Sequence, residues 1–332
     1  MWSYFRLRLL QRVLVDLIGL LVSWFIVWFV VACLVRALAP DPATQLAGPL
    51  TDEATRARFA KEFGLNRPLI IEAGARAFRM LLGDWGISWR TRQPVTEAVI
   101  GPSTLTIGLA LISTIISVAI ALVITAAQRF RPRGRPNTPA WLNLSVLFLF
   151  ISAIPAFITG LWLTQSDLPP MLGLPRQGFH SAGVPLWQTL ILPSICLALP
   201  GLGLALPRLL AARNTIVRSA WYTNSIALGL SPRQILIRQG WPFLAAAVGD
   251  AVVQILIISV TGAVAVEHVF SLPGLGTVLV DAVQLGDLPV ILGVVAVTTL
   301  LTYVSLALRA LFTRGLPTLL RPVSVLLTFK TG

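Results

Sequence analysis

Charged residues are scarce in this sequence. Asp, Glu, Lys and Arg together make up 12% of the 332 residues, whereas a soluble domain has about 25%. Hydrophobic residues make up 56%, and the mean hydropathy is +0.82. So few charges exclude an ordinary soluble protein and indicate a protein with several membrane-spanning helices.

The residue types that carry most enzyme chemistry are also rare. The two lysines, Lys61 and Lys330, do not follow a Gly-x-x-x-x-Gly-Lys-Ser/Thr loop, so any ATP hydrolysis must come from another polypeptide. The hydrolase motifs His-Glu-x-x-His and Gly-x-Ser-x-Gly are absent, and two histidines leave little acid–base machinery. Cys33 and Cys196 lie in separate apolar runs, as packing residues do. These absences argue against an intramembrane enzyme and against a bound metal or other cofactor.

Six segments are long and apolar enough to cross a bilayer, which takes about 20 residues each. The first is too long for a signal peptide and is interpreted as a retained helix with Asp16 at the membrane interface. The sequence therefore predicts an all-α, polytopic membrane protein with six transmembrane helices at about 13–35, 103–127, 141–164, 187–210, 243–267 and 288–311.

Acidic residues are absent from four segments rich in arginine. These are the N-terminal leader, the loop 128–140, the segment 208–242 and the tail from Arg309 onward. Cationic loops stay in the cytoplasm, so both termini are expected there. Topology, and not nucleic-acid binding, then explains the net charge of +13. The long loop 37–102 mixes both signs, and loops longer than about 60 residues cross regardless of charge.

The third of these cationic segments, 208–242, ends in the stretch Ala227–Pro242, ALGLSPRQILIRQGWP, which contains several helix start and stop signals. Gly229 suits the residue just past a helix end, because glycine accepts positive φ. Ser231 is a good N-cap, Pro232 fits the first helical position, and Gln234 completes a capping box. The pattern predicts a first helix over about 216–228, a two-residue corner, and a second helix that enters the membrane.

The first of these helices is apolar although it lies outside the membrane. An exposed apolar helix needs a surface to cover it, which favours a docking element for a soluble partner. A solvated loop whose arginines only fix topology is the alternative. A DNA-binding helix-turn-helix is disfavoured because the corner is short and the second helix runs into the bilayer.

The stretch SAWYTNSIALGLSPRQILIRQGWPFLAAAV resembles the cytoplasmic loop signature of ABC importer permeases. The whole chain is similar to the first permease subunit of the dipeptide/oligopeptide/nickel importer group. The most specific stretch is TGAVAVEHVFSLPGLGTVLVDAVQLGDLPVILG at 261–293, and ALAPDPAT, FAKEFGLNRPL and GDWGISWRTRQPV follow the same group in order.

The resemblance implies a type I importer permease fold in the bacterial inner membrane. It implies a second, related permease subunit, two cytoplasmic ABC ATPases that bind ATP and Mg, and an extracytoplasmic substrate-binding protein, beside membrane lipid. It also implies a coupling helix that fits a groove of the ATPase. That element is Asn224, Ser225, Ile226, Ala227, Leu228, Gly229, Leu230, Ser231, Pro232 and Arg233.

The resemblance divides the chain into four parts. They are a leader and first helix at 1–36, an outer loop at 37–102, a five-helix permease core at 103–312 with the coupling loop 211–242, and a tail at 313–332. The outer loop is expected to hold short helices, one starting at Thr51 before Asp52 and Glu53 and stopping near Gly64.

Two features depart from the family. Its coupling helix usually carries several cations and an acid, whereas Ala220, Thr223, Ile226 and Leu228 stand at the corresponding positions here. The family's Asp-Pro-Arg after the last helix is also missing, with Thr313 and Arg314 near that place. A contact with the ATPase that is more apolar than usual is therefore expected.

Asp250 and Gln254 lie one turn apart in the fifth span, followed by Ser259 and Thr261. An acid within a membrane span is costly and often functional, so these four are candidates for the translocation pathway, where Asp250 could attract a cationic group. The alternative is a structural carboxylate bonded to a neighbouring helix. Glu267 and His268 do not suggest a metal site, because adjacent helical residues point in different directions.

The nearest rival function is an ion-coupled secondary transporter, for which the prolines of the fourth span are the only hint. Loss of uptake on mutating the ATPase, with the proton gradient intact, would separate the two. Short peptides are the expected cargo, with nickel complexes, opines or sugars as open alternatives.

Overall fold

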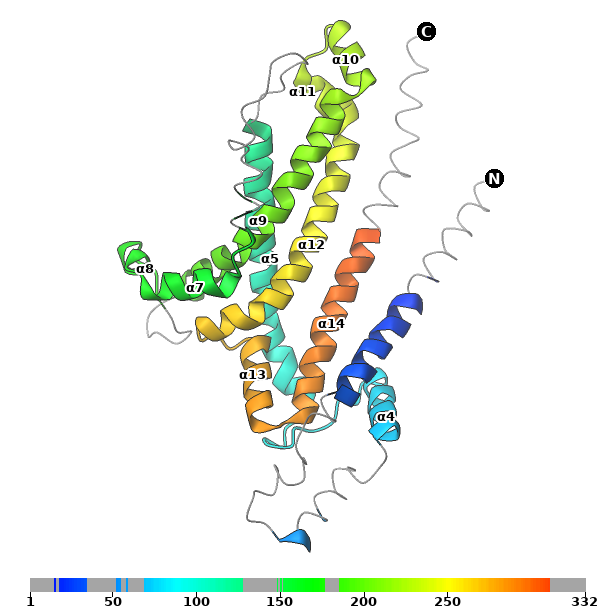
Figure 1. The fold of residues 1–332 in the computed structure, drawn as a ribbon, viewed down its shortest axis with the longest axis vertical. Helices are drawn as coiled ribbons and strands as arrows, with labels where there is room; N and C mark the ends of the chain where they lie inside the picture. The colour runs from blue at the N-terminus through cyan, green and yellow to red at the C-terminus, as the bar shows by residue number, and fades with distance from the viewer. Residues whose placement is uncertain are drawn as a thin grey trace. The chain divides into compact units, whose positions relative to one another are not determined.

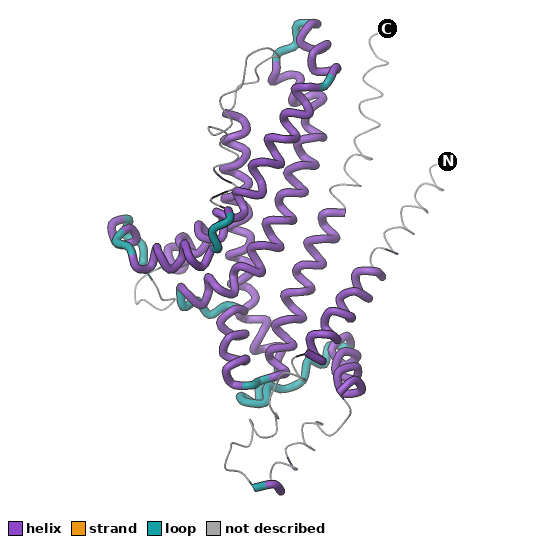
Figure 2. Tube along the Cα trace, in the orientation of Figure 1, coloured by secondary structure: helices purple, strands orange, loops and turns teal. Residues whose placement is uncertain are grey.

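The structure, a computed structural model, describes residues 18–34, 69–127, 152–176 and 185–310, with a few isolated positions at 15, 52–54, 58, 148 and 150. These residues are mainly helical (Figure 2). The β-pairing found among them is one isolated antiparallel bridge, between Ile87 and Pro94. Several predictions lie outside the described residues: the leader, Asp16, Thr51, Gly64, the loop 128–140, Thr313 and Arg314.

The helices follow one another along the chain as Figure 1 shows. They are an apolar helix Ile18–Leu34, α4 Leu69–Leu81, α5 Val95–Ala127, α7 Ala156–Gln165, α8 Leu168–Met171, α9 Leu186–Arg218, α10 Ala220–Ala227, α11 Pro232–Ile235, a π-helical turn Leu236–Gly240, α12 Trp241–Val269, α13 Leu275–Leu285 and α14 Leu288–Ala310.

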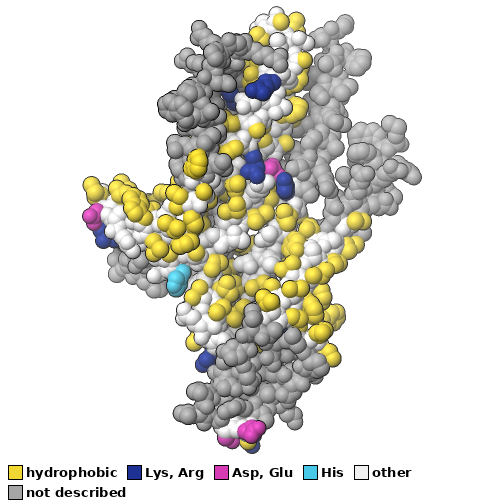
Figure 3. All heavy atoms as spheres, viewed as in Figure 1, with side chains coloured by type: hydrophobic (Ala, Val, Ile, Leu, Met, Phe, Trp, Pro, Cys, Tyr) yellow, Lys and Arg dark blue, Asp and Glu magenta, His cyan; other side chains and the backbone are white. Residues whose placement is uncertain are grey.

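Four helices are long and apolar enough to cross a membrane, namely those at α5, α9, α12 and α14. They confirm the second, fourth, fifth and sixth predicted spans. The helix Ile18–Leu34 is the described part of the first predicted span. The fold is the predicted all-α membrane architecture, and Figure 3 shows how widely hydrophobic side chains cover one face of the described surface.

Two spans differ from their predicted bounds at prolines. α5 begins at Val95 and includes Pro102, so the helix starts eight residues before the predicted position 103. Within the predicted span 141–164, the helical structure is interrupted at Pro155, which adopts φ −57° and ψ 137° and directly precedes α7. Proline has no N–H to donate to the preceding turn, and at Pro155 the helix breaks whereas at Pro102 it continues.

The chain forms two compact units. One comprises Met1–Thr106 with Pro273–Tyr303, and the other comprises Ile107–Leu272 with Val304–Gly332. The long helices α5 and α14 each contribute to both units.

In the first unit, the helix Ile18–Leu34 packs against α4 and the first turns of α14. Buried indoles anchor it, since Trp24 Nε1 donates to the Ala296 carbonyl at 3.3 Å and Trp28 Nε1 donates to the Leu292 carbonyl at 3.2 Å. The buried carboxylate of Asp287 accepts from the Ser88 hydroxyl and from the Trp89 N–H at 3.2 Å. These bonds hold the loop after α4 against the turn that precedes α14.

In the second unit, α5, α9 and α12 approach closely through small residues. The Ser113 hydroxyl donates to the Ser259 hydroxyl at 2.9 Å, and the Ser117 hydroxyl donates to the Ala198 carbonyl at 2.9 Å. A Cβ added at Gly201 would lie 2.6 Å from Ser117 Oγ. Small side chains let membrane helices approach this closely, and these contacts make α5, α9 and α12 one packed body.

Candidate functional site

The predicted coupling segment begins with a break in the helix, at Ser219. α9 runs as far as Arg218. The sequence analysis predicted instead one continuous helix over about 216–228. That prediction was wrong. Ser219 is extended, with φ −70° and ψ 147°, and its hydroxyl oxygen accepts from the Tyr222 N–H at 3.4 Å. Ser219 therefore caps a new helix, α10, and turns it away from the axis of α9 (Figure 1).

Gly229 ends α10 in the left-handed conformation, with φ +84°. The Gly229 N–H donates to the Ile226 carbonyl at 2.9 Å, and the Leu230 N–H donates to the Ser225 carbonyl at 3.1 Å. This pair of bonds is a Schellman motif, which satisfies carbonyls at a helix end and favours glycine at the residue with positive φ. The predicted role of Gly229 as the helix stop is confirmed.

Ser231 starts the next helix with the predicted capping box. The Gln234 N–H donates to Ser231 Oγ at 3.4 Å, and the Ser231 N–H donates to Gln234 Oε1 at 2.9 Å. Pro232 occupies the first helical position. The helix passes through the π-helical turn Leu236–Gly240 directly into α12, so α10 and α11 form a corner joined to membrane helices at both ends.

A small hydrophobic core supports this corner from beneath. Ile216, Tyr222 and Ile235 are buried together, with Trp221 and Leu230 packed against them. Burial raises the pKa of the Tyr222 phenol, and the positive charge of Arg213 offsets part of that rise. Tyr222 therefore stays neutral at physiological pH, as a core residue should. Ile216 and Tyr222 lie in the segment 216–228, which the sequence predicted as an exposed apolar helix, whereas in the structure they are buried.

The outward face of the corner combines apolar side chains with uncharged polar ones and carries almost no charge. Leu228 is 82% exposed, and Ile226 is exposed beside it. Thr223 and Asn224 are also exposed, and Arg233 is the charged residue among the exposed positions from 220 to 234. An exposed leucine next to an exposed isoleucine, on a rigidly capped corner, is a surface that a partner could cover.

The ten predicted coupling residues do not all share this face. Ser225 is buried, and its hydroxyl contacts the Trp221 carbonyl at 2.8 Å and Gln239 Oε1 at 3.4 Å. Leu230 is half-buried in the core beneath the corner. The exposed members are Asn224, Ile226, Ala227, Leu228, Gly229, Ser231, Pro232 and Arg233.

Asp250 lies further along α12, between two arginines. Its carboxylate contacts Arg309 Nε at 2.5 Å and Arg208 Nε at 3.4 Å. Gln254 joins the group, because its side-chain oxygen accepts from Arg208 and its Nε2 donates to Asp250 Oδ2 at 3.4 Å. We call these four residues the Asp250 cluster. It ties α9, α12 and the last turn of α14 together within the second unit.

Ser259 and Thr261 do not join the Asp250 cluster. Ser259 is fully buried against Ser113 in the packing of α5 and α12. Thr261 is exposed, and its hydroxyl donates to the Ile257 carbonyl at 3.1 Å in its own helix. The four predicted pathway residues thus occupy three different environments. Arg208 and Arg309 were missed, although arginines at the ends of neighbouring spans are a signal for partners of an acid inside a span.

No group of three or more metal-binding side chains occurs within the described part of the chain. Glu267 is fully buried while His268 is exposed, so the two side chains diverge as expected for neighbours on a helix. α12 ends at Val269 with Phe270 as its C-cap and Ser271 at φ +52°, and the Leu272 N–H donates to the Glu267 carbonyl at 2.8 Å. This outer turn is a helix stop like the one at Gly229.

Comparison with known proteins places this architecture in a family. Residues 136–320 match the family described as binding-protein-dependent transport system inner membrane component. The glutathione transport system permease protein GsiC of Salmonella paratyphi A is 30% identical over 291 residues, which cover 85% of this chain and 90% of the relative. The chain therefore belongs to the family of binding-protein-dependent transport system inner membrane components. The GsiC protein of Escherichia coli strain K12 is 28% identical over the same coverage.

The chain is therefore an integral permease subunit of an ABC importer and a multi-pass protein of the bacterial inner membrane. It is a transport subunit and not itself an enzyme. The resemblance inferred from the motifs at 219–248 and 261–293 is confirmed, because the matched residues 136–320 include both stretches.

Proposed function

We propose that the corner formed by α10 and α11 is the surface through which a cytoplasmic ATPase drives this permease subunit. In this proposal two ATPase subunits bind ATP and Mg beneath the membrane, and the corner faces them because the arginine-rich segments lie in the cytoplasm. A second permease subunit completes the pathway, and an extracytoplasmic binding protein delivers the solute.

One observation carries the proposal. The corner presents Leu228, 82% exposed, on a helix whose two ends are fixed by Ser219 and Gly229. The same corner is joined to α9 at Ser219 and passes through the π-helical turn Leu236–Gly240 into α12. A protruding apolar side chain on a capped helix outside the bilayer is suited to a groove in a partner protein. A displacement of the corner by that partner would be transmitted to the membrane helices α9 and α12, because the corner is covalently joined to both.

The cargo that we propose is a short peptide or a related small solute. The relatives are named for glutathione transport, which supports a small peptide-like molecule. Uptake of radiolabelled glutathione and dipeptides, each measured with the binding protein that delivers it, would distinguish among these solutes.

The contact itself can be tested by truncating Leu228. Burying a leucine side chain contributes about 1.5–3 kcal/mol, so Leu228→Ala should weaken association with the ATPase about tenfold to a hundredfold. The measurement is the amount of ATPase that copurifies with the permease at a series of ATPase concentrations, together with solute uptake in proteoliposomes.

Leu172→Ala is the matched control, because Leu172 is also strongly exposed but lies at the end of α8, away from the corner. It should leave ATPase association unchanged. An unaltered ATPase affinity in Leu228→Ala, at normal membrane yield, would show that the corner is not the docking surface.

A further inference from the structure

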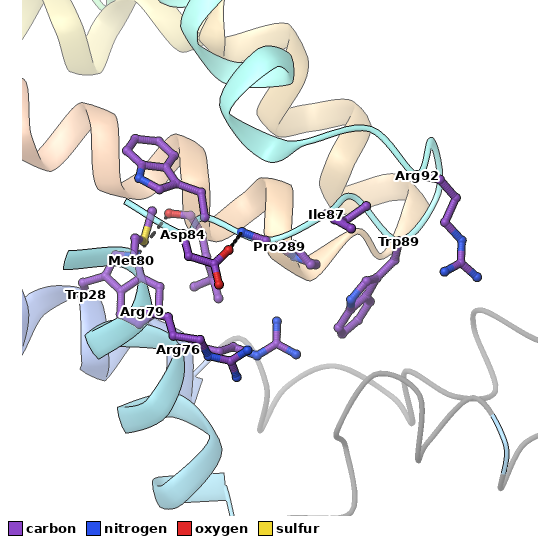
Figure 4. A pocket seen from close by; sticks show the side chains of 12 residues that line it. Trp28, Arg76, Arg79, Met80, Asp84, Ile87, Trp89, Arg92 and Pro289 are labelled. Carbon is purple, nitrogen blue, oxygen red and sulfur yellow. Dashed lines mark hydrogen bonds between the residues drawn. The ribbon is translucent and has the colours of Figure 1, made fainter. Parts of the chain in front are cut away.

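The first unit contains a hollow of about 520 Å³ whose described lining includes no residue of the corner or of the Asp250 cluster. Arg76 and Arg79 of α4 line one side, and Trp89 and Arg92 of the following loop line another. Trp28, Met80, Asp84, Trp85, Gly86, Ile87, Pro289 and Leu292 complete the described lining (Figure 4). The volume lies within the range of about 300–1,000 Å³ that is common for small-ligand sites.

The lining combines positive charge with indole rings. The described lining holds three arginines, Arg76, Arg79 and Arg92, and one acid, Asp84, whose Oδ1 accepts from the Gly86 N–H at 3.1 Å. The guanidinium of Arg76 lies 5.4 Å from the ring centre of Trp89, which holds it in place by a cation–π contact. Among the described lining residues positive charge is therefore in excess, which suits an anion.

α4 has three faces, and they indicate where the anion comes from. Ala73, Ala77 and Met80 are buried against the core of the first unit. Arg76 and Arg79 form a cationic face that lines the hollow. The third face is apolar and yet exposed, and consists of Ile70, Ile71 and Phe78, continued by Leu82 just past the end of the helix.

An amphipathic helix with an exposed apolar face and arginines beside it is typical of a helix that lies in a membrane interface. The helix Ile18–Leu34, against which α4 packs, also exposes apolar side chains, including Ile18, Leu21, Ile26 and Val30. Tryptophans gather at the level of lipid headgroups in membrane proteins, and Trp28, Trp85 and Trp89 all line the hollow.

We propose that α4 lies in the outer leaflet with its apolar face among the acyl chains, and that the hollow binds the phosphate of an anionic phospholipid such as phosphatidylglycerol. Arg76, Arg79 and Arg92 bind the phosphate, and the indoles flank the glycerol. The choice of leaflet rests on the orientation in the proposed function, whereas the lipid site itself does not depend on any ATPase contact.

The test uses the full-length chain purified in an uncharged detergent. Native mass spectrometry counts bound lipid during titration with phosphatidylglycerol, with phosphatidylcholine of the same acyl chains, and with inorganic phosphate. We expect phosphatidylglycerol to bind at least tenfold more tightly than phosphatidylcholine, and inorganic phosphate not to compete with it. Each arginine near a lipid surface is worth about a fivefold change in affinity, so Arg79→Gln should lose about fivefold and Arg76→Gln with Arg79→Gln about 25-fold.

Two variants serve as controls. Arg79→Lys keeps the charge and should retain most of the affinity, and Arg176→Gln removes an exposed arginine that pairs with Asp167 outside the hollow and should change nothing. Because Arg79 is exposed at the rim, its variant keeps the test valid if the double variant folds poorly.

Equal affinity for the two lipids, or equal losses in Arg79→Gln and Arg176→Gln, would overturn the proposal. Competition by inorganic phosphate at the same affinity would point to a free anion and also overturn it. An unchanged lipid affinity together with weaker association of the extracytoplasmic binding protein would assign the hollow to protein docking. None of these outcomes bears on the corner around Gly229, which is tested by ATPase association.

Discussion

Gly229 offers a sharp test of whether the shape of the corner matters for transport. Its φ of +84° lies where residues with a Cβ are strained, yet a Cβ added there would meet no atom within 4 Å. A substitution at Gly229 therefore changes the backbone preference without a steric clash. Left-handed backbone costs an ordinary residue about 1–2 kcal/mol, and a β-branched residue is among the poorest in that region.

We expect Gly229→Val to raise the free energy of the docked corner by about 2 kcal/mol. Before docking, the corner can relax by giving up the bonds from Gly229 and Leu230 to the end of α10, whereas docking requires the native turn. Association with the ATPase should then weaken by up to about 30-fold. Solute uptake in proteoliposomes should fall, while the amount of protein in the membrane stays normal.

Gly229→Asn is the matched control, because asparagine adopts positive φ more readily than other side chains. The predicted order of uptake is wild type, then Gly229→Asn, then Gly229→Ala, then Gly229→Val. Normal uptake in Gly229→Val would refute the coupling role of this turn. Equal losses in the asparagine and valine variants would refute the backbone argument and leave side-chain bulk as the cause.

The remaining predictions concern the membrane helices. Asp250→Asn leaves Arg208 and Arg309 without a shared anion. We expect the free energy of unfolding to fall by about 1–3 kcal/mol, a range that already allows for the partial exposure of the cluster. The measurement is the unfolding midpoint in detergent, which should be lower in the variant. A change in solute preference at unchanged stability would instead assign Asp250 to the pathway. Gly201→Ala should destabilise by about 1–3 kcal/mol, because its Cβ would lie 2.6 Å from Ser117 Oγ. Gly108→Ala, with no atom within 4 Å, should be tolerated, and similar midpoints for the two variants would contradict the packing of α5 against α9.

Local signals in the sequence predicted the corner better than its surroundings. Gly229 and the Ser231–Gln234 box act through bonds between residues at most five positions apart, so their pattern is readable along the chain. The break at Ser219 was also local but was missed, because the apolar residues on both sides of it continue a helical pattern. Serine before an aromatic pair was the available signal for that N-cap.

Contacts between distant segments could not be predicted in the same way. Asp250 was recognised as an acid inside a span, but its partner Arg309 is 59 residues away, and nothing in the local pattern selects it over other arginines. The hollow next to α4 was missed for the same reason, because its lining comes from three segments between Trp28 and Leu292. The buried face of α4 is set by alanines, which carry little hydrophobic signal.

The Asp250 cluster changes the charge that an acid inside a membrane span presents to its surroundings. The carboxylate has two guanidinium partners, so the group as a whole carries one net positive charge. It lies about 14 Å along α12 from Trp241, where that helix begins. The net charge at this level of α12 is therefore positive, the reverse of what an isolated aspartate would impose.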